Sequence, residues 1–386
     1  MELKLQHRMN KAGEIKVLTL MPYKFLPPKL GGQKHFAFFF KFFSSLIKTT
    51  CVTVKDNDVT YVKEYEVLNI IQNGKMRYVN PVYFFKLRKI IKEKEITHFI
   101  IEHPYYGWLG ILLKLFCKIK FVIRSQNIEA ERFKSIGKWW WGILWNYEKI
   151  SHRFADYNFF IQQDDEKYGI EKYKLDPCKC HIITYGFELT APPSQQERAT
   201  ARTTIAALYH IETNENIILF NGSLNYKPNT DALDNILNHI NPLLLATTNF
   251  KYKIIICGSN LAPSYNALKD YSGKNIIYAG FVDDITLYYK AAGMLINPVM
   301  DGGGIKTKLV EALGYNLNVV TTTSGAIGVP LSITGEKMKI IADDNWNSFT
   351  DAIIKSKPEA DIPEAFFNHF YWGKIAEKAV NILKEN

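Results

Sequence analysis

The sequence predicts an α/β protein built from two Rossmann-like domains. Short apolar runs that are typical of buried parallel strands alternate with amphipathic helical segments, as at residues 15–21, 98–102, 217–220 and 294–299. Several of these runs end in a glycine-containing turn that a helix follows, which is the pattern of βαβ units. The chain has 386 residues, enough for two domains that each bury a core of their own.

The first domain is predicted to span residues 1–190. Strands are expected at 15–21, 50–54, 76–79, 98–102, 120–124, 157–161 and 181–184, and helices near 33–47, 82–94 and 111–116. The helix near 33–47 is rich in phenylalanine and apolar on nearly every side. This composition favours burial in the core over the alternative, a position at a membrane surface.

The second domain is predicted to span residues 205–365. Residues 191–204 are polar and contain two prolines, a composition typical of an interdomain linker. Strands are expected at 217–220, 254–257, 275–278, 294–299 and 319–322, and helices at 230–240 and 305–315. The aromatic and apolar segment 366–386 predicts a last helix.

The net charge of +10 is distributed unevenly between the two halves. Residues 1–190 have a net charge of +12 and residues 191–386 a net charge of −2. The asymmetry indicates that the first half meets an anionic surface or substrate, such as lipid or nucleic acid, unless it is a solvated basic surface without a partner. No apolar signal core opens the chain, and the five cysteines are an odd number, so we expect a cytoplasmic protein.

The stretch from residue 297 to residue 329 predicts a site for a phosphate-linked sugar. Glycines 302–304 allow the backbone to approach a phosphate, and the free N–H groups of the helix that follows point toward it. Lys306 and Lys308 add positive charge beside this turn. Glu311 lies one helical turn after Lys308, where its carboxylate can accept hydrogen bonds from sugar hydroxyls. The alternative is a buried loop with solvated lysines.

This stretch resembles the donor-site motif of the retaining, nucleotide-sugar-dependent glycosyltransferases of family 4, which have the GT-B fold. The shared features are a strand that ends in Pro298, the glycine loop, the run Lys308-Leu309-Val310-Glu311-Ala312 and the run Val319-Val320-Thr321. The resemblance implies two Rossmann-like domains that face each other across a cleft. It also implies that the C-terminal helix crosses back to the first domain.

By the resemblance, most donor-binding residues belong to the second domain. Glu311 is expected to bind the nucleotide ribose, and Lys306 and Lys308 the diphosphate. The full expected donor set is Gly31, Gly32, Ser223, Lys227, Phe281, Val282, Gly302, Gly303, Gly304, Ile305, Lys306, Lys308 and Glu311.

One part of the donor motif differs from the family pattern. Many members have two glutamates separated by seven residues, and Glu311 matches the second of them. Gly303 stands at the place of the first, so Asp301 is the candidate to replace it. His103, at the end of a strand, matches a histidine that lies near the donor sugar in the family. His103, Glu311 and Asp301 therefore form the expected catalytic set.

The loop after residues 120–124 resembles a His-Asn-x-Glu sequence that lines the acceptor site in the family. Gln126 replaces the histidine here, whereas Asn127 and Glu129 are retained. We therefore expect Gln126, Asn127 and Glu129 to bind the acceptor. The alternative for Glu129 is an ordinary acidic residue in the first turn of a helix.

Residues 134–149 combine four tryptophans with Lys134, Lys138 and Lys149. Tryptophan is enriched at water–lipid boundaries and also stacks on sugars, whereas the alternative is packing against the sheet. The neighbouring lysines keep peripheral contact with an anionic membrane, at the inner face of the cytoplasmic membrane, as a hypothesis beside this packing.

The sequence therefore predicts a metal-independent hexosyltransferase. It moves a sugar, with retention, from a nucleotide-diphosphate sugar to a glycan or lipid-linked acceptor in cell-envelope polysaccharide synthesis. The donor is a substrate, and we expect no cofactor, no metal and no nucleic-acid partner. One alternative is a catalytically degenerate GT-B protein that binds glycan or lipid or acts as an accessory subunit. A sugar-nucleotide epimerase shares the fold, but the sequence does not identify its catalytic carboxylates. A dehydrogenase is excluded because no G-x-G-x-x-G opens the first helix.

Overall fold

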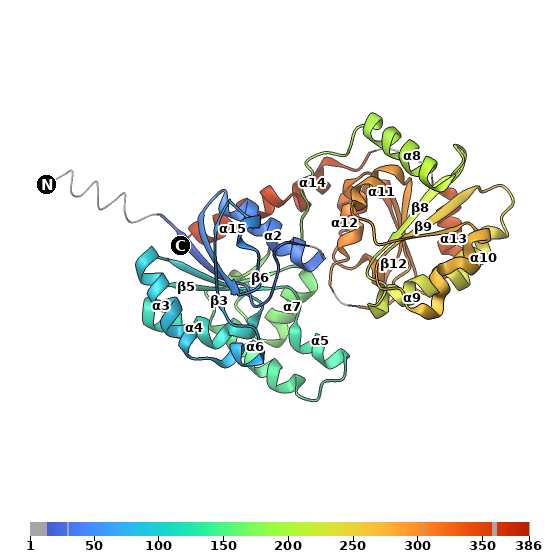
Figure 1. The fold of residues 1–386 in the computed structure, drawn as a ribbon. Coiled ribbons are helices and arrows are strands. Elements are labelled where there is room, and N and C mark those ends of the chain that lie inside the picture. The colour runs from blue at the N-terminus through green and yellow to red at the C-terminus, as the bar shows by residue number, and fades with distance from the viewer. Residues whose placement is uncertain (1–13, 29–30, 303, 357–360, 386) are drawn as a thin grey trace. The chain divides into compact units, whose positions relative to one another are not determined.

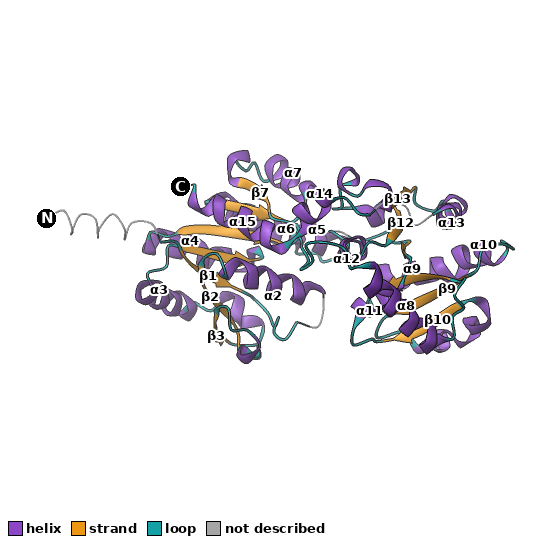
Figure 2. Ribbon diagram, turned by 90° about the horizontal axis from the view of Figure 1, so that it is seen from above, coloured by secondary structure: helices purple, strands orange, loops and turns teal. Residues whose placement is uncertain are grey.

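The chain divides into two compact units, each built around a parallel sheet (Figures 1 and 2). The computed structural model describes residues 14–28, 31–302, 304–356 and 361–385. Unit 1 contains residues 1–188 and 372–386, and unit 2 contains residues 189–371. Helices cover the sheets, which confirms the predicted α/β class with two Rossmann-like domains.

The described part of unit 1 contains a seven-stranded sheet in the order β3-β2-β1-β4-β5-β6-β7, with every neighbouring pair parallel. The strands are β1 (Lys16–Leu20), β2 (Lys48–Val54), β3 (Glu66–Ile71), β4 (His98–Glu102), β5 (Lys120–Ser125), β6 (Tyr157–Phe160) and β7 (Cys180–Ile182). The central strands are buried along nearly their whole length, as expected for a sheet that helices cover on both faces.

Helices pack on both sides of this sheet. They are α2 (Gly31–Ser44), α3 (Val82–Lys94), α4 (Gly107–Cys117), α5 (Glu129–Ser135), α6 (Trp141–Phe154), α7 (Gln163–Lys172) and α15 (Trp372–Lys384). Helices α2 and α15 pack together on one side, and α3, α4 and α6 pack in sequence on the other (Figure 1). The phenylalanines Phe36, Phe39, Phe40 and Phe43 of α2 are buried, which confirms the prediction that this helix lies in the core. Among the described helices, none combines the length and the hydrophobicity that crossing a bilayer requires.

The C-terminal segment forms two helices rather than the single predicted one. Helix α14 (Glu364–Phe370) belongs to unit 2, and α15 belongs to unit 1. Between them Tyr371 has an extended backbone, which ends the first helix. Trp372 is fully buried, with its ring centre 5.3 Å from that of His35 and 6.1 Å from that of Phe39, both on α2. These contacts confirm that the C-terminal helix crosses back to the first unit.

The described residues of unit 2 form a second parallel sheet, of six strands in the order β10-β9-β8-β11-β12-β13. The strands are β8 (Asn216–Asn221), β9 (Tyr252–Cys257), β10 (Ile276–Gly280), β11 (Met294–Asn297), β12 (Asn318–Thr322) and β13 (Met338–Ile341). The other helices are α8 (Gln195–Tyr209), α9 (Lys227–Asn235), α10 (Asn241–Leu245), α11 (Ile285–Ala291), α12 (Thr307–Gly314) and α13 (Trp346–Lys355).

Two predictions of local structure are wrong. Residues 191–204, the expected linker, include the start of α8. Ser194 and Glu197 form a capping box there, in which the Glu197 amide donates to Ser194 Oγ and the Ser194 amide donates to Glu197 Oε2. Residues 76–79, an expected strand, lie in a 3₁₀ turn, and the strand nearby is β3 at the edge of the sheet.

Candidate functional site

In each sheet the strand order reverses between two central neighbours, β1 and β4 in unit 1 and β8 and β11 in unit 2. Parallel α/β sheets bind ligands outside the carboxyl ends of the strands at such a point. In unit 2 the chain runs from β8 into α9 and from β11 through the glycine loop into α12. Most of the predicted donor residues lie in these two connections or in the helices α9 and α12 that follow them.

The glycine loop after β11 lies against the start of α9. Gly302 has φ +93° and Gly304 has φ +77°, backbone conformations that residues with a side chain rarely adopt. A Cβ atom on Gly302 would lie 3.1 Å from Pro228 Cγ and 3.3 Å from the Tyr226 hydroxyl oxygen. Gly303 lies outside the described residues. The glycines therefore allow a close approach between this loop and α9.

Lys308, in the first turn of α12, places a buried ammonium group in this site. The residue is 9% exposed, and its Nζ donates to Asn229 Oδ1 at 3.0 Å. The same Nζ lies 4.5 Å from the centre of the Phe220 ring. Burial lowers the pKa of Lys308 to about 7, and the positive charge of Lys306 adds to this effect. An anion bound at this place would favour the charged form again.

Lys306 precedes α12 and closes the glycine loop. Its Nζ donates to the carbonyl oxygens of Gly302 at 2.5 Å and Gly304 at 3.0 Å. Burial lowers the pKa of Lys306 to about 8, although the carboxylate of Asp301 opposes the shift. The two lysines concentrate positive charge at a helix N-terminus, which is itself favourable for an anion.

Glu311 is held beside the end of β8 by a tyrosine. Tyr289 donates from its hydroxyl to Glu311 Oε2 at 3.0 Å, and Asn221 Nδ2 donates to the Tyr289 oxygen at 2.9 Å. The ring of Tyr289 also stacks on that of Tyr315, with the ring centres 5.3 Å apart. Asn221 Oδ1 is buried and has no hydrogen-bond partner among the described residues. The half-buried Glu311 therefore has a fixed position near the carboxyl ends of the central strands.

Two predicted polar residues of this loop region have partners close in sequence. Lys227 forms an ion pair with Asp231 at 2.8 Å. Its side chain is 81% exposed on the surface of α9, so its charge is not in the buried site that contains Lys308. Ser223 Oγ donates to Asn225 Oδ1 at 2.8 Å. Unlike Lys308, neither side chain points into a buried site.

The remaining predicted donor-side residues lie in the loops around the same sheet edge. Asp301 Oδ1 accepts a hydrogen bond from the Gly302 amide at 2.6 Å, which fixes the turn of the glycine loop. Ile305 packs so closely on Gly328 that a Cβ atom there would lie 2.8 Å from Ile305 Cβ. Phe281 is 71% exposed and Val282 is half-buried directly after β10.

In unit 1, His103 follows β4 in a strained backbone conformation. Its φ of +66° and ψ of 154° lie in a region that glycine normally occupies, and such strain is concentrated at functional sites. Nε2 lies 2.8 Å from the Tyr23 hydroxyl oxygen. Nδ1 lies 3.1 Å from Glu129 Oε1, at ion-pair distance but without the angle of a hydrogen bond. His103 is thus buried between a tyrosine and a carboxylate.

Glu129 is buried at the start of α5 and already has several partners. Its Oε2 accepts hydrogen bonds from the Tyr105 hydroxyl at 2.6 Å and from Arg132 Nη1 at 3.0 Å. Burial alone would raise the pKa of Glu129, but His103, Tyr105 and Arg132 together lower it to about 2. The backbone N–H of Glu129 donates to the buried carboxylate of Glu148. Glu129 is therefore a fixed anion inside the site.

Gln126 also has a structural partner. Its Nε2 donates to Glu102 Oε2 at 3.2 Å, and Arg124 Nη1 donates to both oxygens of the same carboxylate at 3.2 Å. Arg124 Nη2 lies 2.5 Å from His35 Nε2 on α2. Asn127 is half-buried beside Gln126 in the chain. The pair of Glu102 and Arg124 is buried below the loop that was predicted to bind the acceptor.

Gly31 and Gly32 lie at the start of α2, which is 14 residues long. A Cβ atom on Gly32 would meet no atom within 4 Å, so packing inside the protein does not require glycine there. A residue without a side chain leaves the first N–H groups of the helix accessible to a ligand.

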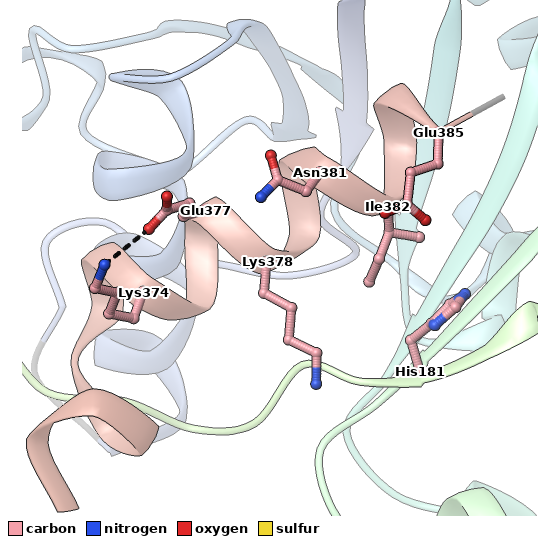
Figure 3. Close-up of a pocket in the computed structure, with 7 residues that line it drawn as sticks. All are labelled: His181, Lys374, Glu377, Lys378, Asn381, Ile382 and Glu385. Atoms are coloured by element: carbon pink, nitrogen blue, oxygen red, sulfur yellow. Dashed lines mark hydrogen bonds and ion pairs between the residues drawn. The ribbon is translucent and has the colours of Figure 1, made fainter. Parts of the chain in front are cut away.

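A shallow hollow of about 420 Å³ lies on α15 beside β7 (Figure 3). It is lined by His181, Lys374, Glu377, Lys378, Asn381, Ile382 and Glu385. Lys374 and Glu377 form an ion pair at 3.2 Å, so part of its charge is already neutralised. None of the predicted site residues lines it, and we assign no ligand to it.

Five residues that complete the two sites were not predicted to belong to them: Asn221, Asn229 and Tyr289 in unit 2, and Tyr23 and Tyr105 in unit 1. Asn221 ends β8, and Tyr23 and Tyr105 closely follow β1 and β4, so their places after strands could have identified them. Tyr289 lies within α11, where no local sequence pattern indicates a role.

Comparison with known proteins agrees with this geometry. Residues 215–356 match the family model described as glycosyl transferases group 1. An uncharacterised 44.6 kDa protein from the cps region of Klebsiella pneumoniae is 28% identical over 159 residues, which span 40% of each chain.

Solved structures resemble the chain over nearly its whole length. A glycosyltransferase from Rickettsia africae superposes with a TM-score of 0.69 at 15% identity, over 96% of this chain and 98% of that one. The Anabaena protein HepE in complex with UDP gives a TM-score of 0.71 at 14% identity, over 96% and 100%. The sucrose-phosphate synthase of Thermosynechococcus elongatus gives 0.72 at 13% identity, over 96% and 98%. The resemblance found in the sequence is therefore confirmed at the level of the fold and of the second domain: the chain has the GT-B fold, and its residues 215–356 match the group 1 glycosyltransferases.

Proposed function

We propose that the protein transfers a hexose from a nucleotide-diphosphate sugar to a glycan or lipid-linked acceptor, with retention of configuration. The observation that supports it best is the buried Lys308, which lies in the first turn of α12 beside Lys306 and the glycine loop. A buried ammonium group is unfavourable unless an anion or strong hydrogen bonds compensate for the lost hydration. Asn229 supplies one hydrogen bond, and the diphosphate of the donor supplies the anion.

The proposed chemistry depends on stabilising the departing diphosphate. Negative charge grows on its oxygens as the bond to the sugar breaks, and preorganised positive groups stabilise this charge without reorganisation. Lys306, Lys308 and the N–H groups at the start of α12 are such groups. Glu311, oriented by Tyr289, accepts hydrogen bonds from the ribose hydroxyls.

We propose UDP-glucose as the first donor to examine, because HepE has been solved with UDP and with UDP-glucose. The relative from a cps region supports a role in the synthesis of a cell-envelope polysaccharide. The acceptor is then a growing glycan or its lipid-linked precursor.

A calorimetric titration with UDP, GDP, ADP and TDP tests the donor site. We expect one nucleotide to bind the wild-type protein, and Glu311→Ala to weaken it about 10- to 100-fold, as for the loss of hydrogen bonds to a charged group. Lys355→Ala is the matched control, since Lys355 forms an exposed pair with Asp351 on α13. Equal affinity in wild type and Glu311→Ala would place the nucleotide elsewhere.

An assay for sugar transfer distinguishes an active enzyme from a degenerate protein that only binds the nucleotide. Two observations favour the degenerate alternative. The Gln126 side chain already donates to Glu102, and a glycine stands at position 303 in place of the first glutamate of the family pattern. Mass spectrometry of a membrane extract incubated with the bound donor should show a product heavier by one hexose. Nucleotide binding without any product from a cps-type lipid fraction would support the degenerate protein.

We further propose that the surface formed by α5, α6 and the turn between them contacts an anionic membrane. Trp139 is 84% exposed, and Ile143 and Ile150 are 68% and 52% exposed on one face of α6. Lys134 and Lys138 are exposed beside them. Apolar side chains next to basic residues are typical of an interfacial membrane surface.

Two other tryptophans of this segment support the packing alternative for their own positions. Trp145 donates from Nε1 to the Tyr168 hydroxyl at 2.9 Å, and Trp140 packs on Phe133 with ring centres 4.7 Å apart. Trp139 is thus the tryptophan of the segment that we propose for insertion.

Vesicle co-sedimentation tests the membrane surface. Changing Lys134, Lys138 and Lys149 together to glutamate should lower binding to phosphatidylglycerol vesicles more than a hundredfold, since each lysine near an anionic surface contributes about 1 kcal/mol. The control is the same change at the exposed Lys251, Lys269 and Lys355 of unit 2. Equal binding of the two triple variants would refute the proposed surface.

A further inference from the structure

The carboxyl ends of β1, β4 and β5, three neighbouring strands, bring together Tyr23, His103 and Glu129. The three side chains form a continuous line: the Tyr23 hydroxyl lies 2.8 Å from His103 Nε2, and His103 Nδ1 lies 3.1 Å from Glu129 Oε1. They come from segments 80 and 26 residues apart in the chain, so local sequence does not create the arrangement.

Contacts around the line hold each member in place. The ring of His103 stacks on Tyr105, with ring centres 5.4 Å apart and planes 20° from parallel. Phe36 lies on another side, at 5.9 Å. Glu129 is fixed by the Tyr105 hydroxyl and by Arg132. The strained backbone of His103 persists because these neighbours determine where its ring lies.

The groups on either side of His103 favour one tautomer of its ring. An ionised carboxylate only accepts hydrogen bonds, so a carboxylate next to Nδ1 favours the proton on that nitrogen. In the neutral imidazole Nε2 is then an acceptor, and the Tyr23 hydroxyl donates to it. The Tyr23 oxygen keeps a lone pair that can accept a hydrogen bond from another group. Tyr23 itself is half-buried rather than enclosed.

We propose that Tyr23, His103 and Glu129 act as one preorganised unit, in which Tyr23 accepts a hydrogen bond from a sugar hydroxyl of the bound substrate. In this arrangement Glu129 is a positioning residue that fixes the tautomer of His103, and not a ligand of the acceptor. The proposal rests on the proposed glycosyl transfer for the identity of the ligand. It departs from the sequence-based assignment, in which His103 and Glu129 have separate substrates.

The first test uses the protein without substrate. In histidine labelled with ¹⁵N, long-range ¹H–¹⁵N spectra distinguish the two tautomers, and His103→Asn identifies the signal of His103. We expect the Nδ1-protonated form in the wild-type protein and in Tyr23→Phe, and a mixture or the other form in Glu129→Gln. An Nε2-protonated His103 in the wild-type protein, or an unchanged tautomer in Glu129→Gln, would overturn the positioning role.

The second test measures transfer. Tyr23→Phe removes one oxygen and should lower kcat/KM about five- to tenfold, the effect of one neutral hydrogen bond. The substrate whose KM rises, donor or acceptor, is the one that Tyr23 binds. Tyr61→Phe is the matched control, because Tyr61 is 53% exposed in a 3₁₀ turn. Wild-type kinetic constants for both substrates in Tyr23→Phe would overturn the binding role, since a purely structural hydroxyl changes stability alone.

The two experiments test different claims, and each claim can be contradicted independently of the other. If the wild-type protein transfers no sugar, the proposed function is wrong and the substrate role of Tyr23 is lost with it. The tautomer measurement still decides whether Glu129 positions His103.

Discussion

Lys308 Nζ lies 3.0 Å from Asn229 Oδ1, and this hydrogen bond joins the first turn of α12 to the first turn of α9. Asn229 Nδ2 in turn donates to the Ser223 carbonyl oxygen at 3.0 Å. One amide side chain therefore connects the loop after β8 with the buried lysine that follows the glycine loop.

Replacing this amide should weaken both stability and donor binding. Asn229→Ala leaves the buried Lys308 ammonium without this acceptor and should lower the free energy of unfolding by about 1–3 kcal/mol. Urea denaturation measures the loss, and a UDP titration measures the affinity. Asn146→Ala is the control, because Asn146 is exposed on α6 and donates only to the Gly142 carbonyl of its own helix. Equal midpoints for the two variants would contradict the role of Asn229.

Donor binding should take up a proton at Lys308. In the free protein burial holds the pKa of Lys308 at about 7, so the side chain is mostly neutral at pH 8. A diphosphate favours the charged form, and its affinity should therefore fall as the pH rises above 7, by up to about tenfold per pH unit. Calorimetry at pH 8 in buffers with different ionisation enthalpies measures the uptake. Lys308→Met should remove that uptake, and an unchanged uptake would assign the proton to another group.

The same residue predicts a change of stability with pH. An unfolded lysine has a pKa of 10.5, so between pH 7 and 10.5 the unfolded chain binds more protons at residue 308 than the folded chain does. The contribution of Lys308 to the free energy of unfolding therefore rises with pH across this window and is lost as the pH falls through 7. Comparing urea denaturation of the wild-type protein and Lys308→Met at pH 7 and pH 9.5 isolates this contribution. A parallel pH dependence in both proteins would refute it.

Some residues of the candidate site could be predicted from the sequence because they are close together along the chain. Lys306, Lys308 and Glu311 lie within six residues of each other, and a glycine cluster between a strand and a helix marks their surroundings. The capping box of Ser194 and Glu197 was equally local, but the polar composition around it indicated a linker instead.

Other contacts of the candidate sites could not be predicted, because they are made between residues that are far apart along the chain. The partners His35 and Arg124 are 89 residues apart, and Tyr23 and His103 are 80 residues apart. Their contact depends on the order of strands in the sheet, and no spacing along the chain encodes it. The break at Tyr371 has no glycine or proline at the residue itself, and the nearby Gly373 lies inside α15.

The glycine loop should not tolerate a side chain at Gly302. An alanine there would have to keep φ near +93°, and its Cβ would lie 3.1 Å from Pro228 Cγ. The backbone strain is about 1–2 kcal/mol, so the loop should shift and donor affinity should fall at least about tenfold. Gly142→Ala is the control, since a Cβ on Gly142 meets no atom within 4 Å and alanine is favoured inside a helix. A Gly302→Ala protein with the UDP affinity of the Gly142→Ala protein would show that the turn does not shape the site.

The packing of α15 on unit 1 should make a large contribution to stability. Trp372 is fully buried, and its ring lies against His35, Phe39 and Tyr185. Trp372→Ala removes this contact area and leaves a cavity, which should lower the free energy of unfolding by about 3–5 kcal/mol. Trp139→Ala is the matched control, because the 84% exposed Trp139 has little buried area to lose. Urea denaturation that follows tryptophan fluorescence compares the two variants. Similar midpoints would show that α15 does not form part of the core of unit 1. A loss confined to Trp372→Ala would show that the C-terminal helix is required to complete the fold of the first unit.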